Sequence, residues 1–255
     1  SLERSAEPAA ASLERLAWPE VESAIAAGKT TLVVPLGATE QHGPHLPLDT
    51  DARIARELAA RFCRHVPEAI AAPVVALGCS REHSAFPGTL SLETETLERL
   101  LRDLLAPLRG HGFRRAFVFS AHGGNVQALR EMAPRLRSAV APLEVTVFAD
   151  LGELMPRLQA ASARFGVSAE ASGHHAGEFE TSILLALEPD AVREARLAAG
   201  FTEPTDDPQS LFYPSLREHA PNGVVGDPRG ADAARGETYL EAWVDELVAA
   251  YGRGT

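Results

Sequence analysis

The stretch TLVVPLGATEQHGPHLPLDTD, residues 31–51, decides the fold and also carries the densest group of polar side chains. Residues 31–36 form a β-branched and apolar run that ends at Gly37, which predicts a strand buried on both faces. Short runs of the same kind predict three more strands, at residues 72–77, 116–119 and 145–148. Amphipathic stretches lie between these runs, at residues 52–62, 92–108 and 126–136. The alternation predicts an α/β fold, a three-layer α/β/α sandwich with a mostly parallel sheet.

The other segments are predicted to be helical or irregular. Pro19 and Gly28 are placed to open and close a short helix near the start. Two further helices are predicted at residues 176–187 and 236–251. The Pro-rich stretch between them is expected to cover a site or a subunit contact. We predict a flexible arm at residues 1–12 and one domain over residues 13–255.

Composition excludes several classes of partner. The formal net charge is −11, so a nucleic acid would meet overall repulsion, and we predict no nucleic-acid partner. No apolar run reaches the roughly 20 residues that cross a bilayer, so we predict no membrane partner. The two cysteines, Cys63 and Cys79, are too few for a disulfide framework, which favours a cytoplasmic location.

Glu40, His42 and Asp51 lie in or just after the connection that follows the first strand. Mixed carboxylate and imidazole groups suit Zn²⁺ or Mn²⁺, and Fe²⁺ accepts the same donors. In an extended segment Glu40 and His42 would point the same way and Gln41 would face elsewhere. The alternative is a solvated turn in which Asp51 caps the next helix.

His122 follows the third predicted strand and precedes a helix, so it falls at the sheet edge where α/β proteins bind ligands. Gly123 and Gly124 permit a close backbone approach there, and we predict that both contact the substrate. A nucleotide-binding loop is the alternative, but the segment has neither the dinucleotide fingerprint nor the lysine of a Walker loop.

Glu180 falls on the apolar stripe of the helix predicted at residues 176–187. A bare carboxylate there would cost several kcal/mol, so it must be protonated, paired with an arginine or bound to a metal. We predict metal ligation because the two other clusters need a further carboxylate. Glu178 is predicted to point away into solvent.

The motifs together resemble the creatininase (creatinine amidohydrolase) family. They are Glu40-Gln-His42-Gly-Pro-His, Asp51, Phe86-Pro-Gly-Thr89, His122-Gly-Gly-Asn125 and His175-Ala-Gly-Glu-Phe-Glu180-Thr-Ser, in the family's order. The resemblance implies two divalent cations per subunit, with Asp51 as the bridge. It places Glu40 and His122 on one cation, and His42 and Glu180 on the other. It also implies a homo-oligomer, a hexamer in related proteins.

The resemblance further implies hydrolysis of a C–N amide bond by metal-activated water. His175 and Glu180 are the predicted catalytic residues, and His175 would stabilise the tetrahedral intermediate or pass a proton to the leaving nitrogen. His83 is predicted to contact the substrate, and a plain loop histidine is the alternative. A thiol amidase using Cys79 is a further alternative.

The substrate predicted from the sequence is a small-molecule amide of the formamide or cyclic type, with a bond other than a peptide bond. Creatinine-cleaving relatives carry an aromatic residue and a Glu where this chain has Gly123 and Gly124, and they close the pocket with tryptophans. The two tryptophans here, Trp18 and Trp243, lie near the chain ends, so we predict that creatinine is not the substrate. Two alternatives are a peptidase that trims a mycofactocin-type precursor and a non-catalytic metal-binding oligomer.

Overall fold

The computed structural model describes residues 12–254. Four parallel strands form one sheet in the order β2-β1-β3-β4. They are β1 (Thr31–Leu36), β2 (Ala69–Ala71), β3 (Arg115–Ser120) and β4 (Glu144–Phe148). Thr31 lies opposite Ala69 on one side and Arg115 on the other, and Leu36 lies opposite Ser120. The sequence-based fold class is therefore confirmed, and β1 has the predicted bounds.

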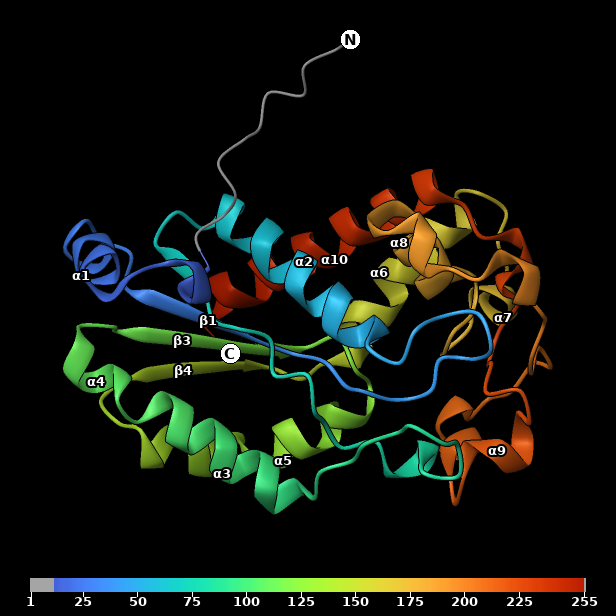
Figure 1. Cartoon of the computed structure of the whole chain (residues 1–255), viewed down its shortest axis with the longest axis horizontal. Coiled ribbons are helices and arrows are strands. Elements are labelled where there is room, and N and C mark those ends of the chain that lie inside the picture. Colours follow the sequence, from blue (N-terminus) through green and yellow to red (C-terminus); the bar gives the residue numbers. More distant parts are fainter. Residues whose placement is uncertain (1–11, 255) are drawn as a thin grey trace, which may run out of the picture.

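Helices cover both faces of this sheet (Figure 1). They are α1 (Trp18–Ala26), α2 (Thr50–His65), α3 (Thr94–Leu105), α4 (Leu108–His111), α5 (Gly124–Ala139), α6 (Leu151–Ala163), α7 (Ala169–Ser172), α8 (Glu178–Leu187), α9 (Leu216–His219) and α10 (Ala233–Arg253). Among residues 12–254, none of the helices has the length and apolar character needed to cross a bilayer.

Alternate side chains of the strands feed two separate cores. Val33 and Phe117 pack with apolar residues of α2, α6, α8 and α10. Leu32 and Val118 point to the opposite face and pack with residues of α3 and α5. The period-two alternation of a strand thus divides one continuous apolar run between two helical layers.

Three sequence-based boundaries need correction. The strand predicted at residues 72–77 is wrong: β2 ends at Ala71, and beyond it only Val75 forms an isolated bridge, to Leu36. Pro35 of β1 has no N–H to continue the ladder to this segment, whereas Thr31 and Gly37, on the same side of the chain, donate to the Glu68 and Val75 carbonyls. The helix predicted over residues 92–108 is broken by Pro107, which precedes α4. Helix α6, which contains Pro156, was not predicted.

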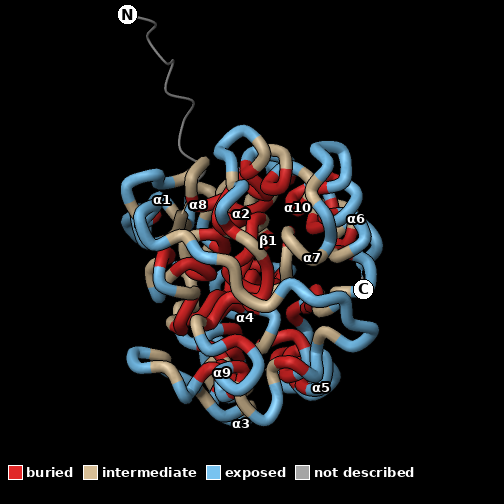
Figure 2. Tube along the Cα trace, turned by 90° about the vertical axis from the view of Figure 1, so that its right-hand side faces the viewer, coloured by how far each residue is buried: buried red, intermediate tan, exposed pale blue. Residues whose placement is uncertain are grey.

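The carboxyl ends of the strands meet at the right-hand side of Figure 1, where long loops follow β1 and β2 and a short connection follows β3. Figure 2 looks onto this edge and shows buried segments behind a rim of exposed loops. Most of the predicted arm at residues 1–12 lies outside the described residues, so that prediction is untested.

Candidate active site

Glu40, Asp51 and His122 converge at this edge of the sheet. Glu40 follows β1, Asp51 lies in the first turn of α2, and His122 sits between β3 and α5. Glu40 Oε2 lies 3.3 Å from His122 Nε2, and Asp51 Oδ2 lies 3.3 Å from His122 Nδ1. The ligand atoms of all three residues lie within 4.8 Å of one another, as a shared cation requires. Asp51 is not the helix cap, because Asp49 holds that position.

Three carboxylate oxygens in this cluster are buried without a donor. Both oxygens of Glu40 and Oδ2 of Asp51 have no hydrogen-bond partner among residues 12–254. Glu40 is fully buried, and Asp51 is 1% exposed. Burying charged oxygens in this way is costly unless a cation compensates them. The donor set therefore fits a divalent metal better than it fits a structural ion pair.

His42 and Glu180 form a second cluster beside the first, together with His175. His42 Nε2 lies 3.1 Å from Asp51 Oδ1 and 3.9 Å from Glu180 Oε1. Ligand atoms of His42, His175 and Glu180 lie within 4.8 Å of one another. Asp51 faces both His42 and His122, so its position is that of a bridging carboxylate. All five predicted metal ligands are thus brought together.

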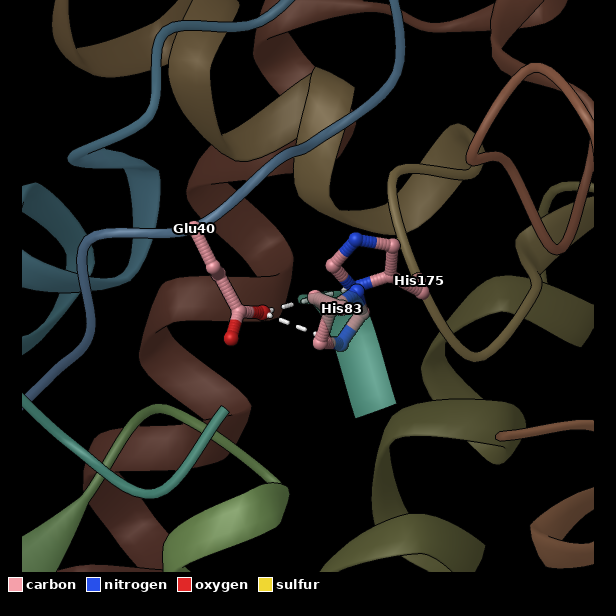
Figure 3. Close-up of side chains that lie close together, drawn as sticks. All are labelled: Glu40, His83 and His175. Atoms are coloured by element: carbon pink, nitrogen blue, oxygen red, sulfur yellow. Dashed lines mark ion pairs between the residues drawn. The ribbon is translucent and has the colours of Figure 1, made fainter. Parts of the chain in front are cut away.

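A third cluster joins Glu40, His83 and His175 (Figure 3). His83 Nε2 and His175 Nδ1 lie 3.4 and 3.8 Å from the same oxygen, Glu40 Oε1. His83 is 1% exposed, and its contact with the substrate stays a prediction. The structure places it at the centre, where it also lines the pocket.

The charges of the two clusters are strongly coupled. Burial opposes the charged form of His42, but Asp51 outweighs burial and raises the pKa of His42 to about 10. Burial raises the pKa of Glu180 to about 7, although His42 opposes this. Burial lowers the pKa of His83 to about 4 and that of His175 well below its ordinary value. Without bound cations, the proton on His42 partly balances the negative charge of the carboxylates, while the rings of His83 and His175 are neutral.

Gly123 and Gly124 both line the pocket, but only one of them is tightly enclosed. A Cβ atom at Gly124 would lie 2.4 Å from His122 Nε2 and 2.5 Å from Glu82 Oε1, whereas one at Gly123 would meet nothing within 4 Å. Gly124 therefore leaves room for the His122 ring, and substrate contact by Gly123 and Gly124 stays a prediction. Glu82, which was not assigned a role, is 6% exposed and lies 4.0 Å from His122 Nε2.

Two polar residues lie elsewhere than the sequence indicated. Gln41 was expected to face away, but it is 5% exposed and its amide contacts His83. Glu178 was expected in solvent, but it is 2% exposed and accepts hydrogen bonds from Ser182, Arg235 and Tyr239. Neither position could be deduced from periodicity, because each depends on partners far along the chain.

The clusters open into a pocket of about 420 Å³. Phe212 and Tyr213 of the Pro-rich stretch line it, which confirms that this stretch covers a site. Its apolar part includes Phe179 of α8 and Trp243 of α10, whose rings lie 5.9 Å apart. Although Trp243 lies near the chain end, it reaches the pocket, so the sequence argument from the tryptophans fails for this residue.

The creatininase family's sequence model, described as creatinine amidohydrolase, matches residues 14–251. The chain belongs to the creatininase family. This confirms the resemblance and, at the level of a creatininase-like hydrolase, the predicted enzyme class.

Relatives of this creatininase-family chain differ in their named substrates. It is 36% identical over 239 residues to the mycofactocin precursor peptide peptidase of Mycobacterium ulcerans (strain Agy99), a match that covers 88% of this chain and 86% of the relative. It is 30% identical over 261 residues to the creatinine amidohydrolase of Pseudomonas putida, with 91% and 92% covered. A solved structure described as creatininase Mn superposes with a TM-score of 0.77 at 27% identity, covering 96% of this chain and 98% of that one.

Proposed function

We propose that this chain is a metal-dependent hydrolase that cleaves a C–N amide bond, and that two divalent cations held by its carboxylates and imidazoles would activate the attacking water. The observation that carries the proposal is that buried oxygens of Glu40 and Asp51 have no hydrogen-bond donor among the described residues. These carboxylates lie 3.3 Å from the ring nitrogens of His122. Membership of the creatininase family supports the reaction class.

The residues divide into two ligand sets that share Asp51. Glu40 and His122 would hold one cation, and His42 and Glu180 the other, with Zn²⁺ or Mn²⁺ as the ions that suit these donors. Such a pair lowers the pKa of water and polarises the amide carbonyl. The contacts of Asp51 with one histidine of each set support this partition.

His175 is proposed to carry the proton of the reaction. It is 6% exposed, lines the pocket and stacks against His42 with ring centroids 4.3 Å apart. Hydrolysis forms a bond between the water oxygen and the carbonyl carbon and breaks the C–N bond. A neutral imidazole at this place can accept the proton that the water loses and return it to the leaving nitrogen.

The amide is proposed to be a peptide bond next to an apolar side chain. The pocket continues from the clusters along Met155, Phe179 and Trp243, and Trp243 Nε1 is a buried donor without a partner among the described residues. Such a wall suits an apolar side chain whose backbone carbonyl accepts from the indole. The relatives named as precursor peptide peptidases support the same choice over the small-molecule amide predicted from sequence.

The test is a substrate panel run on one preparation. The protein is stripped with a chelator, reloaded with Zn²⁺ or Mn²⁺, and assayed with formamides, creatinine and short peptides ending in apolar or in acidic residues. We expect hydrolysis of the apolar peptides, lost on stripping, restored on reloading and unaffected by cysteine alkylation. Turnover of formamides alone would contradict the peptide assignment, and inactivity of the fully loaded protein across the whole panel would favour a metal-binding role without catalysis.

A further inference from the structure

The side-chain amide of Gln41 has only one orientation that satisfies its backbone neighbours. Its Oε1 accepts a hydrogen bond of 2.9 Å from the Gly43 N–H, and its Nε2 donates to the Gly223 carbonyl at 3.1 Å. Turning the amide over would set oxygen against oxygen and N–H against N–H. The Nε2 end of Gln41 is therefore fixed toward the pocket by the backbone alone.

Gly223 helps to hold the Gln41 side chain in this orientation. A Cβ atom at Gly223 would lie 1.9 Å from Gln41 Oε1, and the residue has a positive φ of 77°. Only glycine combines that backbone conformation with room for the amide. The turn at residues 221–223 thus holds Gln41 in place.

The fixed amide determines where His83 carries its hydrogen. Gln41 Nε2 lies 2.9 Å from His83 Nδ1. Since Gln41 Nε2 is a donor, His83 Nδ1 must accept, and in a neutral ring the single hydrogen is then on Nε2. That nitrogen is the one that lies 3.4 Å from Glu40 Oε1 without forming a hydrogen bond to it.

The backbone of the same residue determines the hydrogen of His175. His175 Nε2 lies 2.7 Å from the Gln41 carbonyl oxygen, which can only accept. The hydrogen is therefore on Nε2, and the 2.9 Å approach of Gln41 Nε2 to this nitrogen is a contact rather than a hydrogen bond. The two amide hydrogens of Gln41 are already used by His83 and Gly223. His175 Nδ1, 3.8 Å from Glu40 Oε1, is left with its lone pair.

We propose that Gln41 is a positioning residue that holds His83 and His175 in the same tautomer while they face Glu40 through opposite nitrogens. His83 therefore presents an N–H toward Glu40, and His175 presents a lone pair toward the same carboxylate. The cluster of Glu40, His83 and His175 is not a third cation site, because His83 Nε2 is protonated. Resting on the proposed function, His83 is the donor to the carbonyl oxygen that becomes negative, and His175 is the proton acceptor.

The tautomers can be measured without any assay of hydrolysis. Zinc-loaded protein is labelled with ¹⁵N-histidine, the rings are assigned with His83→Gln and His175→Gln, and the protonated nitrogen of each ring is identified by NMR. We expect hydrogen on Nε2 in both rings. Hydrogen on Nδ1 of His83 in the unsubstituted protein would overturn the proposal.

Gln41→Glu separates positioning from a general structural effect. A carboxylate at this place accepts from His83 Nδ1, so the hydrogen of His83 should move to Nδ1, while His175 keeps its hydrogen because the backbone carbonyl is unchanged. Gln127→Glu makes the same charge change elsewhere on the pocket wall and should leave the tautomers of both rings as they were. Equal changes at both rings in Gln41→Glu, or none at His83, would refute the assignment.

Loss of the His83 donor should also lower kcat. In Gln41→Glu, His83 no longer carries a hydrogen on Nε2 that it can donate. This loss should lower kcat by about 10²- to 10³-fold with little change in KM, the usual cost of removing one donor to a developing oxyanion. If the tautomers behave as expected but kcat does not fall, the positioning role stands and the catalytic role assigned to His83 is wrong.

Discussion

Helix α8 carries two glutamates that face different surroundings, Glu178 buried and Glu180 partly buried. Glu178 meets three donors: Ser182 Oγ at 2.8 Å, Arg235 Nε at 2.8 Å and Tyr239 Oη at 2.9 Å. Glu180, two residues later, turns toward His42 and the cation cluster, and its one hydrogen bond comes from the Ala176 N–H. A buried carboxylate with a full set of protein donors ties helices together, whereas one that lacks them marks a place for a ligand.

The largest effect is expected at the bridge between the two ligand sets. Asp51→Asn removes the one carboxylate that both cations would share, so bound metal should fall from two ions per chain to one or none. Hydrolysis should fall by more than about 100-fold, since even the loss of an outer partner of a metal ligand costs 10- to 100-fold. Elemental analysis and steady-state kinetics check this, and two ions retained in the variant would contradict the bridging role.

The opposite result is expected for the structural glutamate of α8. Glu178→Gln leaves Arg235 beside a neutral amide in the α8–α10 interface, which should lower the free energy of unfolding by about 2 kcal/mol. Metal content should stay as it is, because Glu178 bonds only to Ser182, Arg235 and Tyr239. Denaturant unfolding and elemental analysis are measured on the same sample, and a loss of metal would erase the distinction between the two glutamates.

A smaller effect is expected in the pH dependence of metal binding. Asp51 outweighs burial and raises the pKa of His42 to about 10 in the cation-free protein, so this ring carries a proton at neutral pH that a cation must displace. Affinity should therefore rise with pH, by about tenfold per unit for each displaced proton, and fall as the solution is acidified. Chelator competition at pH 6, 7 and 8 measures the slope, and a flat profile would show that His42 is already neutral.

Much of the fold could be predicted from local sequence. The bounds of β1 were predicted correctly, because an apolar β-branched run ending in glycine leaves few alternatives, and the positions of α2 and α5 followed from their amphipathic spacing. The errors occurred where a proline interrupted the expected helix, at Pro107, or the ladder beside the expected strand, at Pro35, or lay inside an unrecognised helix, at Pro156. Those outcomes depend on which N–H groups the neighbouring segments require.

The five proposed ligands could also be named from residue type and position: four of them follow parallel strands, whose carboxyl ends meet at one edge, and Glu180 lies on the apolar stripe of a helix. Residues that act through remote partners could not. Gln41 depends on Gly223, Glu178 on Tyr239, and Trp243 reaches the pocket from the last helix.

By itself, the amino-acid sequence determined the strand and helix alternation, the family and the chemistry of the donors, because these are written in spacing and residue type. Only the tertiary structure decided which buried carboxylates are satisfied and which nitrogen of each histidine carries hydrogen. Those properties depend on residues 42 to 182 positions apart in the chain, whose atoms come within hydrogen-bonding distance only when the layers pack.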